Sequence, residues 1–154
     1  MTVVRNKQGN VIFELEGVDG PDFDSRDLRG RDFTQGVLEG AIFSDANLER
    51  TNFKEADLYW AVLFRANLRN SILDGALLCG ANLREADLTG ASLRDANLGR
   101  DGMGGGTHLQ AARLAGADVT GANFEGAEYD FLTTFPDEFD PNEHGMVFAG
   151  VIDK

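Results

Sequence analysis

The stretch AIFSDANLERTNFKEADL, residues 41–58, repeats one five-residue pattern, and this pattern decides the fold. Every fifth position from Phe23 to Leu98 is Leu or Phe; a small residue usually stands two positions earlier, most often with Asp or Asn between them. A period of five matches neither the 3.6-residue period of a helix nor the two-residue period of a strand. A fixed period over such a span predicts a stack of repeats, each burying its apolar side chains against the next.

The motif A-(D/N)-L-x-x occurs at Ala46-Asn-Leu-Glu-Arg50 and Ala81-Asn-Leu-Arg-Glu85, and over residues 21–130 the chain resembles the pentapeptide-repeat family. The resemblance implies an all-β fold, a right-handed quadrilateral parallel β-helix in which four pentapeptides make one coil. Leu or Phe would fill the interior, Ala would let the wall close tightly, and the outward Asp or Asn would bond turn backbone. Successive coils are then expected about 4.8 Å apart.

Side chains twenty positions apart are therefore expected to stack in columns, of which one is Phe13, Phe33, Phe53, Leu73 and Leu93. The period slips after Asp101-Gly-Met103, and the apolar centres resume at Leu109. We interpret the slip as a bulge of one extra residue within 99–107, so that the columns continue with a spacing of twenty-one. Asp101 stands where Ala is usual, which indicates local distortion rather than a site.

Length and composition indicate one domain with two terminal segments. Residues 1–20 contain two predicted capping strands around an Asn6–Asn10 turn, and residues 21–130 form the β-helix. Residues 131–154 are predicted to form a C-terminal cap on the last coil. The alternative is a homodimer contact, which related proteins make through C-terminal segments. The apolar residues of this segment are Phe131, Leu132, Phe135, Phe139, Met146, Val147, Phe148, Val151 and Ile152.

The sequence offers no arrangement of residues for catalysis. The single cysteine, Cys79, excludes a multi-thiolate metal site and is expected to be a surface thiol. His108 and His144 lie far apart and have no partner at metal-ligand spacing. The glycine run at 102–106 lacks the Lys-Ser or Lys-Thr of a phosphate loop. We therefore expect no enzyme, no metal and no cofactor.

The net charge of −12 argues against direct binding of nucleic acid or of an anionic membrane. With no signal segment and no long apolar run, we expect a cytoplasmic protein, and the resemblance suggests a bacterial source. The alternative is that the acidic rod imitates DNA, since the quinolone-resistance members of the family dock on a type II topoisomerase in place of DNA. Arginines such as Arg50, Arg65 and Arg84 interrupt the acids, which favours a solubility surface.

Apolar side chains cluster at outward positions around one predicted corner of the β-helix. The residues are Ile42, Tyr59, Trp60, Val62, Phe64 and Leu77. We hypothesise that they bind a partner; the alternatives are coverage by the C-terminal segment or a second copy, and neutral drift. The sequence thus predicts a non-enzymatic interaction module, monomer or homodimer, that presents an acidic rod with one hydrophobic edge to an unknown protein partner.

Overall fold

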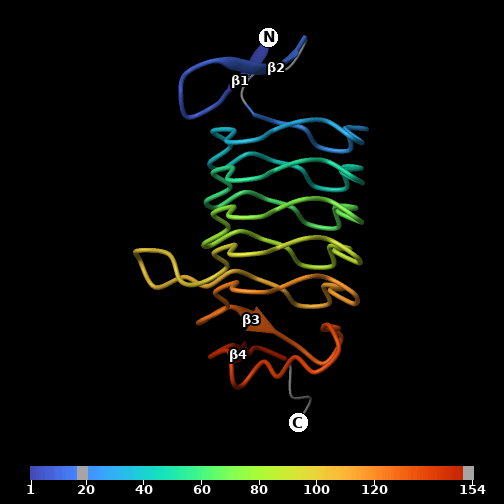
Figure 1. The fold of residues 1–154 in the computed structure, drawn as a ribbon, viewed down its shortest axis with the longest axis vertical. Helices are drawn as coiled ribbons and strands as arrows, with labels where there is room; N and C mark the ends of the chain where they lie inside the picture. The colour runs from blue at the N-terminus through green and yellow to red at the C-terminus, as the bar shows by residue number, and fades with distance from the viewer. Residues whose placement is uncertain (17–20, 151–154) are drawn as a thin grey trace.

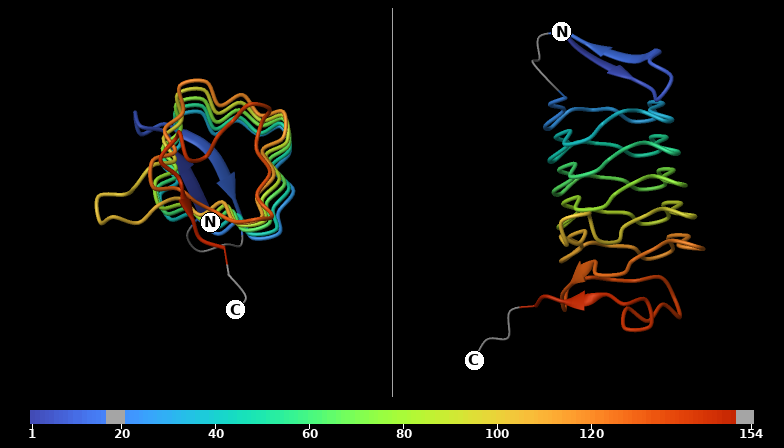
Figure 2. Two further views of the ribbon diagram at one scale, coloured as in Figure 1. Left: turned by 90° about the horizontal axis from the view of Figure 1, so that it is seen from below. Right: turned by 90° about the vertical axis from the view of Figure 1, so that its left-hand side faces the viewer.

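The computed structural model describes residues 1–16 and 21–150, which form a right-handed, four-sided parallel β-helix. Viewed along its axis the stack has four sides, with successive coils nearly superimposed (Figure 2). Parallel bridges join residues twenty apart, as between Asp27 and Asn47 and between Asn47 and Asn67. The predicted fold is confirmed. No helix in the described ranges is long and apolar enough to cross a membrane.

Each side of a coil is a short extended segment bonded to the coils on either side of it. The backbone N–H of Leu48 donates to the carbonyl of Asn67 at 2.7 Å, and that of Asn47 donates to the carbonyl of Arg26 at 2.9 Å. Each corner is closed by a tight turn, in which the N–H of Ala46 donates to the carbonyl of Phe43 at 3.1 Å. The residue before Ala46, Asp45, has a φ of 55°, the left-handed conformation that such a turn requires.

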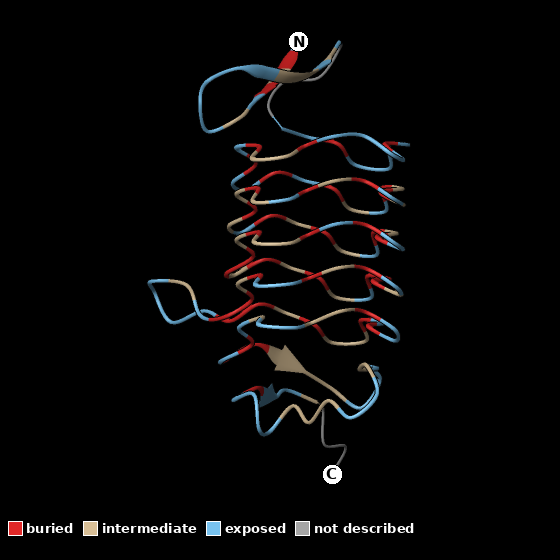
Figure 3. Ribbon diagram, viewed as in Figure 1, coloured by how far each residue is buried: buried red, intermediate tan, exposed pale blue. Residues whose placement is uncertain are grey.

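Leu and Phe fill the interior, and Figure 3 shows that buried residues recur in each coil of the stack. Phe33 stacks on Phe53 with ring centroids 5.3 Å apart, and Phe23 stacks on Phe43 at 4.9 Å. The outward amides follow the prediction as well. Asn67 accepts a bond from the N–H of Arg69 at 3.2 Å, which fixes the turn that follows it.

The N-terminal end of the stack is covered by a hairpin of strands β1 (Thr2–Arg5) and β2 (Val11–Leu15), which pair antiparallel (Figure 1). The carbonyl of Arg5 accepts a bond from the N–H of Val37 at 2.8 Å. Phe13 packs on Phe33 with ring centroids 5.1 Å apart. The hairpin therefore continues both the hydrogen bonds and the aromatic column of the first coils.

The C-terminal segment extends the stack before leaving it. Strands β3 (Glu128–Tyr129) and β4 (Val147–Phe148) pair in parallel. Phe135 and Phe139 pack against the core, which gives this segment the contacts of a cap. Phe131 and Leu132 point away from it and are 78% and 70% exposed. Val151 and Ile152 lie outside the described residues.

The period slip is a projecting loop. Asn82 pairs with His108, twenty-six positions on, and the N–H of Leu83 donates to the carbonyl of His108. Residues 100–105, called the glycine loop below, leave the stack and protrude from its side (Figures 1 and 2). The predicted one-residue bulge with a spacing of twenty-one is wrong, because a further five residues leave the coil together with the extra one. The five-residue period shows only by how much an insertion exceeds a multiple of five, so insertions of one and of six residues look the same in the sequence.

Candidate functional site

Trp60 occupies a corner of the β-helix. Its φ is 54°, and among the described non-glycine residues with positive φ it is the one aromatic. Gly80 occupies the same corner on the following coil, and a Cβ atom placed on it would lie 2.4 Å from Cδ1 of the indole. The ring therefore lies in the space that Gly80 leaves open. It remains 40% exposed to solvent.

Asp101 ties the glycine loop to this corner. Its Oδ2 accepts a hydrogen bond from the indole Nε1 of Trp60 at 2.9 Å. Its Oδ1 accepts bonds from the backbone N–H groups of Met103 at 2.8 Å and Gly105 at 2.7 Å. The bond from Trp60, followed by that from Gly105, holds the pKa of Asp101 below its usual value. The interpretation of Asp101 as local distortion alone is wrong, because its carboxylate organises both the loop and the tryptophan.

Tyr59 and Cys79 lie next to Trp60. The rings of Tyr59 and Trp60 meet edge to face with centroids 5.7 Å apart. A hydrogen bond with Cys79 raises the pKa of the Tyr59 hydroxyl. Cys79 is fully buried, with its thiol 3.8 Å from the carbonyl oxygen of Asn97. The expected surface thiol is therefore wrong, because Tyr59 from the preceding coil and the backbone of the following coil enclose the sulfur.

The other predicted site residues divide between two sides of the β-helix. Ile42 and Val62 are neighbours on adjacent coils, and Ile42 is 38% exposed. Phe64 belongs to the next corner, where the Arg65 guanidinium lies 5.4 Å from the centre of its ring. Leu77 is half-buried on the other side of the Trp60 corner, paired with Asp57. A single cluster around one corner is thus wrong for Phe64, since the positions of Trp60 and Phe64 are almost one full side of a coil apart.

The cover over the corner is not the C-terminal segment, which was one alternative weighed on the sequence. The C-terminal segment stays at the end of the stack, where β4 pairs with β3 (Figure 1). The glycine loop provides the partial cover instead, through Asp101. Met103 within that loop is 82% exposed and was not identified from the sequence. The glycine run at 102–106 was the available signal, but it does not say which corner the loop will meet.

Residues 1–16 and 21–150 contain no group of three or more His, Cys, Asp or Glu side chains that would hold a metal ion. The nearest approach to such a cluster is the pair His108 and Glu128, whose Nδ1 and Oε2 atoms are 2.9 Å apart. Gln110 donates a hydrogen bond to the same Oε2 atom at 2.8 Å. These bonds join neighbouring coils and account for the position of the histidine.

Comparison with solved structures finds chains of the same kind. A pentapeptide repeat protein from the Arabidopsis thaliana thylakoid lumen is 30% identical over 71% of this chain and 69% of its own, with a TM-score of 0.53. One from Nostoc PCC 7120 is 37% identical over 76% and 84%, with a TM-score of 0.40. QnrB1, a plasmid-mediated fluoroquinolone resistance protein, is 17% identical over 82% and 78%, with a TM-score of 0.45, and bears on the fold alone.

No curated protein matches this chain. The family description "Pentapeptide repeats" matches it in eight copies, at residues 27–59, 61–100 and 105–128. These ranges include most of the coils and resume inside the glycine loop. On this evidence the chain belongs to the pentapeptide-repeat family.

Proposed function

We propose that this protein is a non-enzymatic interaction module and that its Trp60 corner binds a protein partner. The observation that carries the proposal is a tryptophan held at a left-handed corner by Asp101 while 40% of it stays exposed. An exposed bulky residue at positive φ is uncommon and is retained where its surroundings fix it. Tryptophan is also among the residues that most often dominate the free energy of protein binding.

The rigidity of the corner supports this proposal. The backbone on both sides is bonded to the neighbouring coils, and the indole has a fixed hydrogen-bond partner in Asp101. A side chain that is already ordered loses little conformational entropy when it docks. Trp60 and its neighbours would offer a patch of a few hundred Å², which suits the centre of an interface whose rim includes the exposed Met103.

The test is a comparison of binding by matched surface variants. The variant Trp60→Ser should fold normally and lose a partner that the parent protein captures and that cross-linking maps to this corner. Ile72→Ser is the control, because Ile72 is 39% exposed on another side of the β-helix. Equal capture by all three proteins would remove the Trp60 corner from the proposal.

Imitation of DNA is the alternative function. In its favour, the chain has a net charge of −12 and a projecting loop (Figure 1). Against it, arginines interrupt the acids on the sides, as Arg65 does beside Asp45 at 2.9 Å and Arg94 does beside Asp118 at 3.1 Å. Slower supercoiling by gyrase in the presence of the purified protein would favour this alternative over the interaction module.

A homodimer through the C-terminal segment fits the exposed end of the stack better than a monomer does. Phe131 contacts Phe148 with ring centroids 4.6 Å apart, yet Phe131 stays 78% exposed beside Leu132. A second copy would cover these side chains and the outer edge of β4. The protein is expected to sediment at twice the monomer mass. The double variant Phe131→Ser, Leu132→Ser should sediment at the mass of the monomer.

A further inference from the structure

One side of the β-helix is basic although the chain as a whole is acidic. Parallel pairing of Asp27, Asn47, Asn67, Asp87 and Arg113 defines this side, called the basic face below. It comprises residues 26–31, 46–51, 66–71, 86–91 and 112–117. It holds six arginines and three carboxylates, a net charge of +3, so the rest of the chain carries −15. A charge count along the sequence hides this separation, because the five segments are twenty or more residues apart.

Half of the arginines on the basic face already hold carboxylates of the chain. The Nη2 atom of Arg29 lies 2.7 Å from Oδ2 of Asp27, and its hydrogen bonds hold the pKa of Asp27 below the usual value. Arg69 and Arg113 share Asp87, at 3.2 and 3.5 Å. The shared pair shows that one carboxylate fits between arginines of the coils on either side of it.

The other three arginines are unpaired. Arg26, Arg31 and Arg50 are exposed and form no ion pair with any residue in the described ranges. Arg31 instead places its guanidinium 5.9 Å from the centre of the Phe13 ring. All three lie in the first two coils, at the N-terminal end of the basic face. The positive charge of this face is therefore least compensated there.

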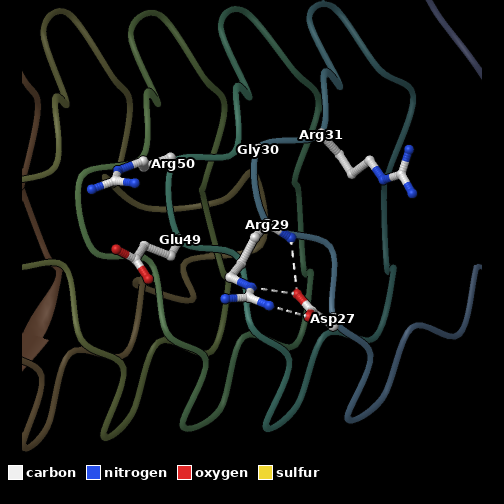
Figure 4. A pocket seen from close by; sticks show the side chains of 6 residues that line it. All are labelled: Asp27, Arg29, Gly30, Arg31, Glu49 and Arg50. Atoms are coloured by element: carbon white, nitrogen blue, oxygen red, sulfur yellow. Dashed lines mark hydrogen bonds and ion pairs between the residues drawn. The ribbon is translucent and has the colours of Figure 1, made fainter.

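A hollow of about 520 Å³ lies at this end of the basic face, lined by Arg29, Arg31 and Arg50 together with Asp27, Gly30 and Glu49. Figure 4 shows Arg29 beside Asp27, Arg50 and Glu49 on the neighbouring coil, and Arg31 on the opposite side. Gly30 lies at the corner between them, and a Cβ atom placed on it would meet nothing within 4 Å. The hollow is thus open to an incoming side chain, and Figure 4 shows Arg31 and Arg50 extending outward on either side of it.

We propose that the basic face binds an acidic segment of a partner protein in extended conformation. Glutamate and aspartate side chains would pair with Arg31 and Arg50 around the hollow, and further carboxylates would meet the arginines of later coils. Five coils spaced about 4.8 Å apart span roughly 20 Å, which matches an extended peptide of six to seven residues. Arginine suits this role because its planar fork binds carboxylates with two parallel hydrogen bonds.

An acidic peptide fits this face better than a nucleic acid. A polyanion as wide as a nucleic acid would extend beyond the basic face. It would then meet the other sides of the β-helix, which belong to the part of the chain with a net charge of −15. Nucleic-acid affinity also depends on how many phosphates are neutralised, and on the basic face only Arg26, Arg31 and Arg50 form no ion pair with a carboxylate of the described residues. The surface is separate from the Trp60 corner, so this proposal does not rest on that one.

The experiment measures binding of a fluorescein-labelled peptide of about eight glutamates, long enough to cross the face. At low ionic strength we expect saturable binding by the parent protein that weakens as salt is added. The variant Arg31→Glu, Arg50→Glu should bind about tenfold more weakly, since two exposed attractions become repulsions. Circular dichroism would establish that the variant retains the fold.

The matched control is Arg65→Glu. Arg50 and Arg65 both occupy exposed corners with φ near 57° and 56°, and Glu85 shows that glutamate adopts this conformation in the same fold. Arg65→Glu should weaken peptide binding less, because Arg65 only borders the basic face and is already paired with Asp45 at 2.9 Å. An equal loss in the control, no binding by the parent, or equally tight binding of an oligothymidylate of the same charge would each overturn the proposal.

Discussion

The regular coils and the glycine loop both rely on backbone hydrogen bonds, but they find the partners for these bonds in different places. In the coils, most backbone N–H groups bond to the adjacent coil or close a corner, as that of Leu48 does with the carbonyl of Asn67. In the loop, the carboxylate of Asp101 replaces the adjacent coil by accepting bonds from Met103 and Gly105. The coils are therefore stabilised by neighbours that repeat, whereas the loop depends on hydrogen bonds within itself and on the contact of Asp101 with Trp60.

Because of this difference, substitutions should be tolerated less in the coils than in the loop. A side chain inside the stack touches its equivalents in the coils above and below, so its loss is felt in three layers. A residue of the loop touches one corner, and the coils on either side remain paired through Asn82 and His108. We expect the energetic effects to fall steeply from the interior to the corners and then to the loop.

Phe53→Ala should have the largest effect. Phe53 is fully buried and stacks on Phe33, with ring centroids 5.3 Å apart. Removing the ring should lower the free energy of unfolding by about 3–5 kcal/mol, through lost burial and the cavity left behind. Urea unfolding measures the change, and Ile72→Ala, on the surface, should cost less than about 1 kcal/mol. A cost for Phe53→Ala as small as that of the control would mean that the interior collapses freely, contrary to a stack of rigid coils.

Gly80→Ala compared with Gly40→Ala isolates the contribution of the Trp60 corner. Both glycines have positive φ, +70° and +66°, so alanine at either position should cost about 1 kcal/mol or more in backbone strain. A Cβ on Gly80 would also meet the indole at 2.4 Å, whereas one on Gly40 would meet nothing within 4 Å. Gly80→Ala should therefore be the more destabilising and should alter tryptophan fluorescence. Equal effects in both measurements would mean that the indole does not depend on the space above Gly80.

The fold was predictable because one rule, the five-residue period, determines every inward position. Leu48, Phe53 and Leu58 are buried as the period requires, and Asn67 bonds the turn as expected. The site was predictable only in part. Trp60 is exposed at a corner, but the same reasoning placed Phe64 beside it and Cys79 on the surface.

The failures have a common physical origin. Outward side chains are placed by contacts between coils, and the five-residue period carries no information about which neighbour will cover them. Tyr59 encloses Cys79 from the preceding coil, and Asp101 reaches Trp60 across forty-one positions. The length of the loop was not predictable for a related reason. An insertion of six residues shifts a five-residue period by the same amount as an insertion of one residue. The basic face was not predictable from the sequence, because its arginines are adjacent in the fold but far apart in the chain.

The smallest expected effect is a loss of the Trp60 contact in acid. The pKa of Asp101 is lowered, first by its bond from Trp60, so its folded value lies below the unfolded value of about 3.9. A lowered pKa means that the contact is complete above the unfolded value and is lost as the pH falls through the folded one. Tryptophan emission should be constant from about pH 8 to about pH 5 and shift to the red below about pH 4.

Two variants assign this transition to Asp101. Asp101→Asn should remove the pH dependence, because the amide does not titrate. Asp118→Asn should leave the transition in place, since Asp118 also has a lowered pKa but bonds Thr120 on another side of the β-helix. A transition that persists in Asp101→Asn would mean that acid loosens the coils around Trp60 rather than the loop. The regular stack and the glycine loop would then respond to acid together, against the separate stabilisation inferred from their hydrogen bonds.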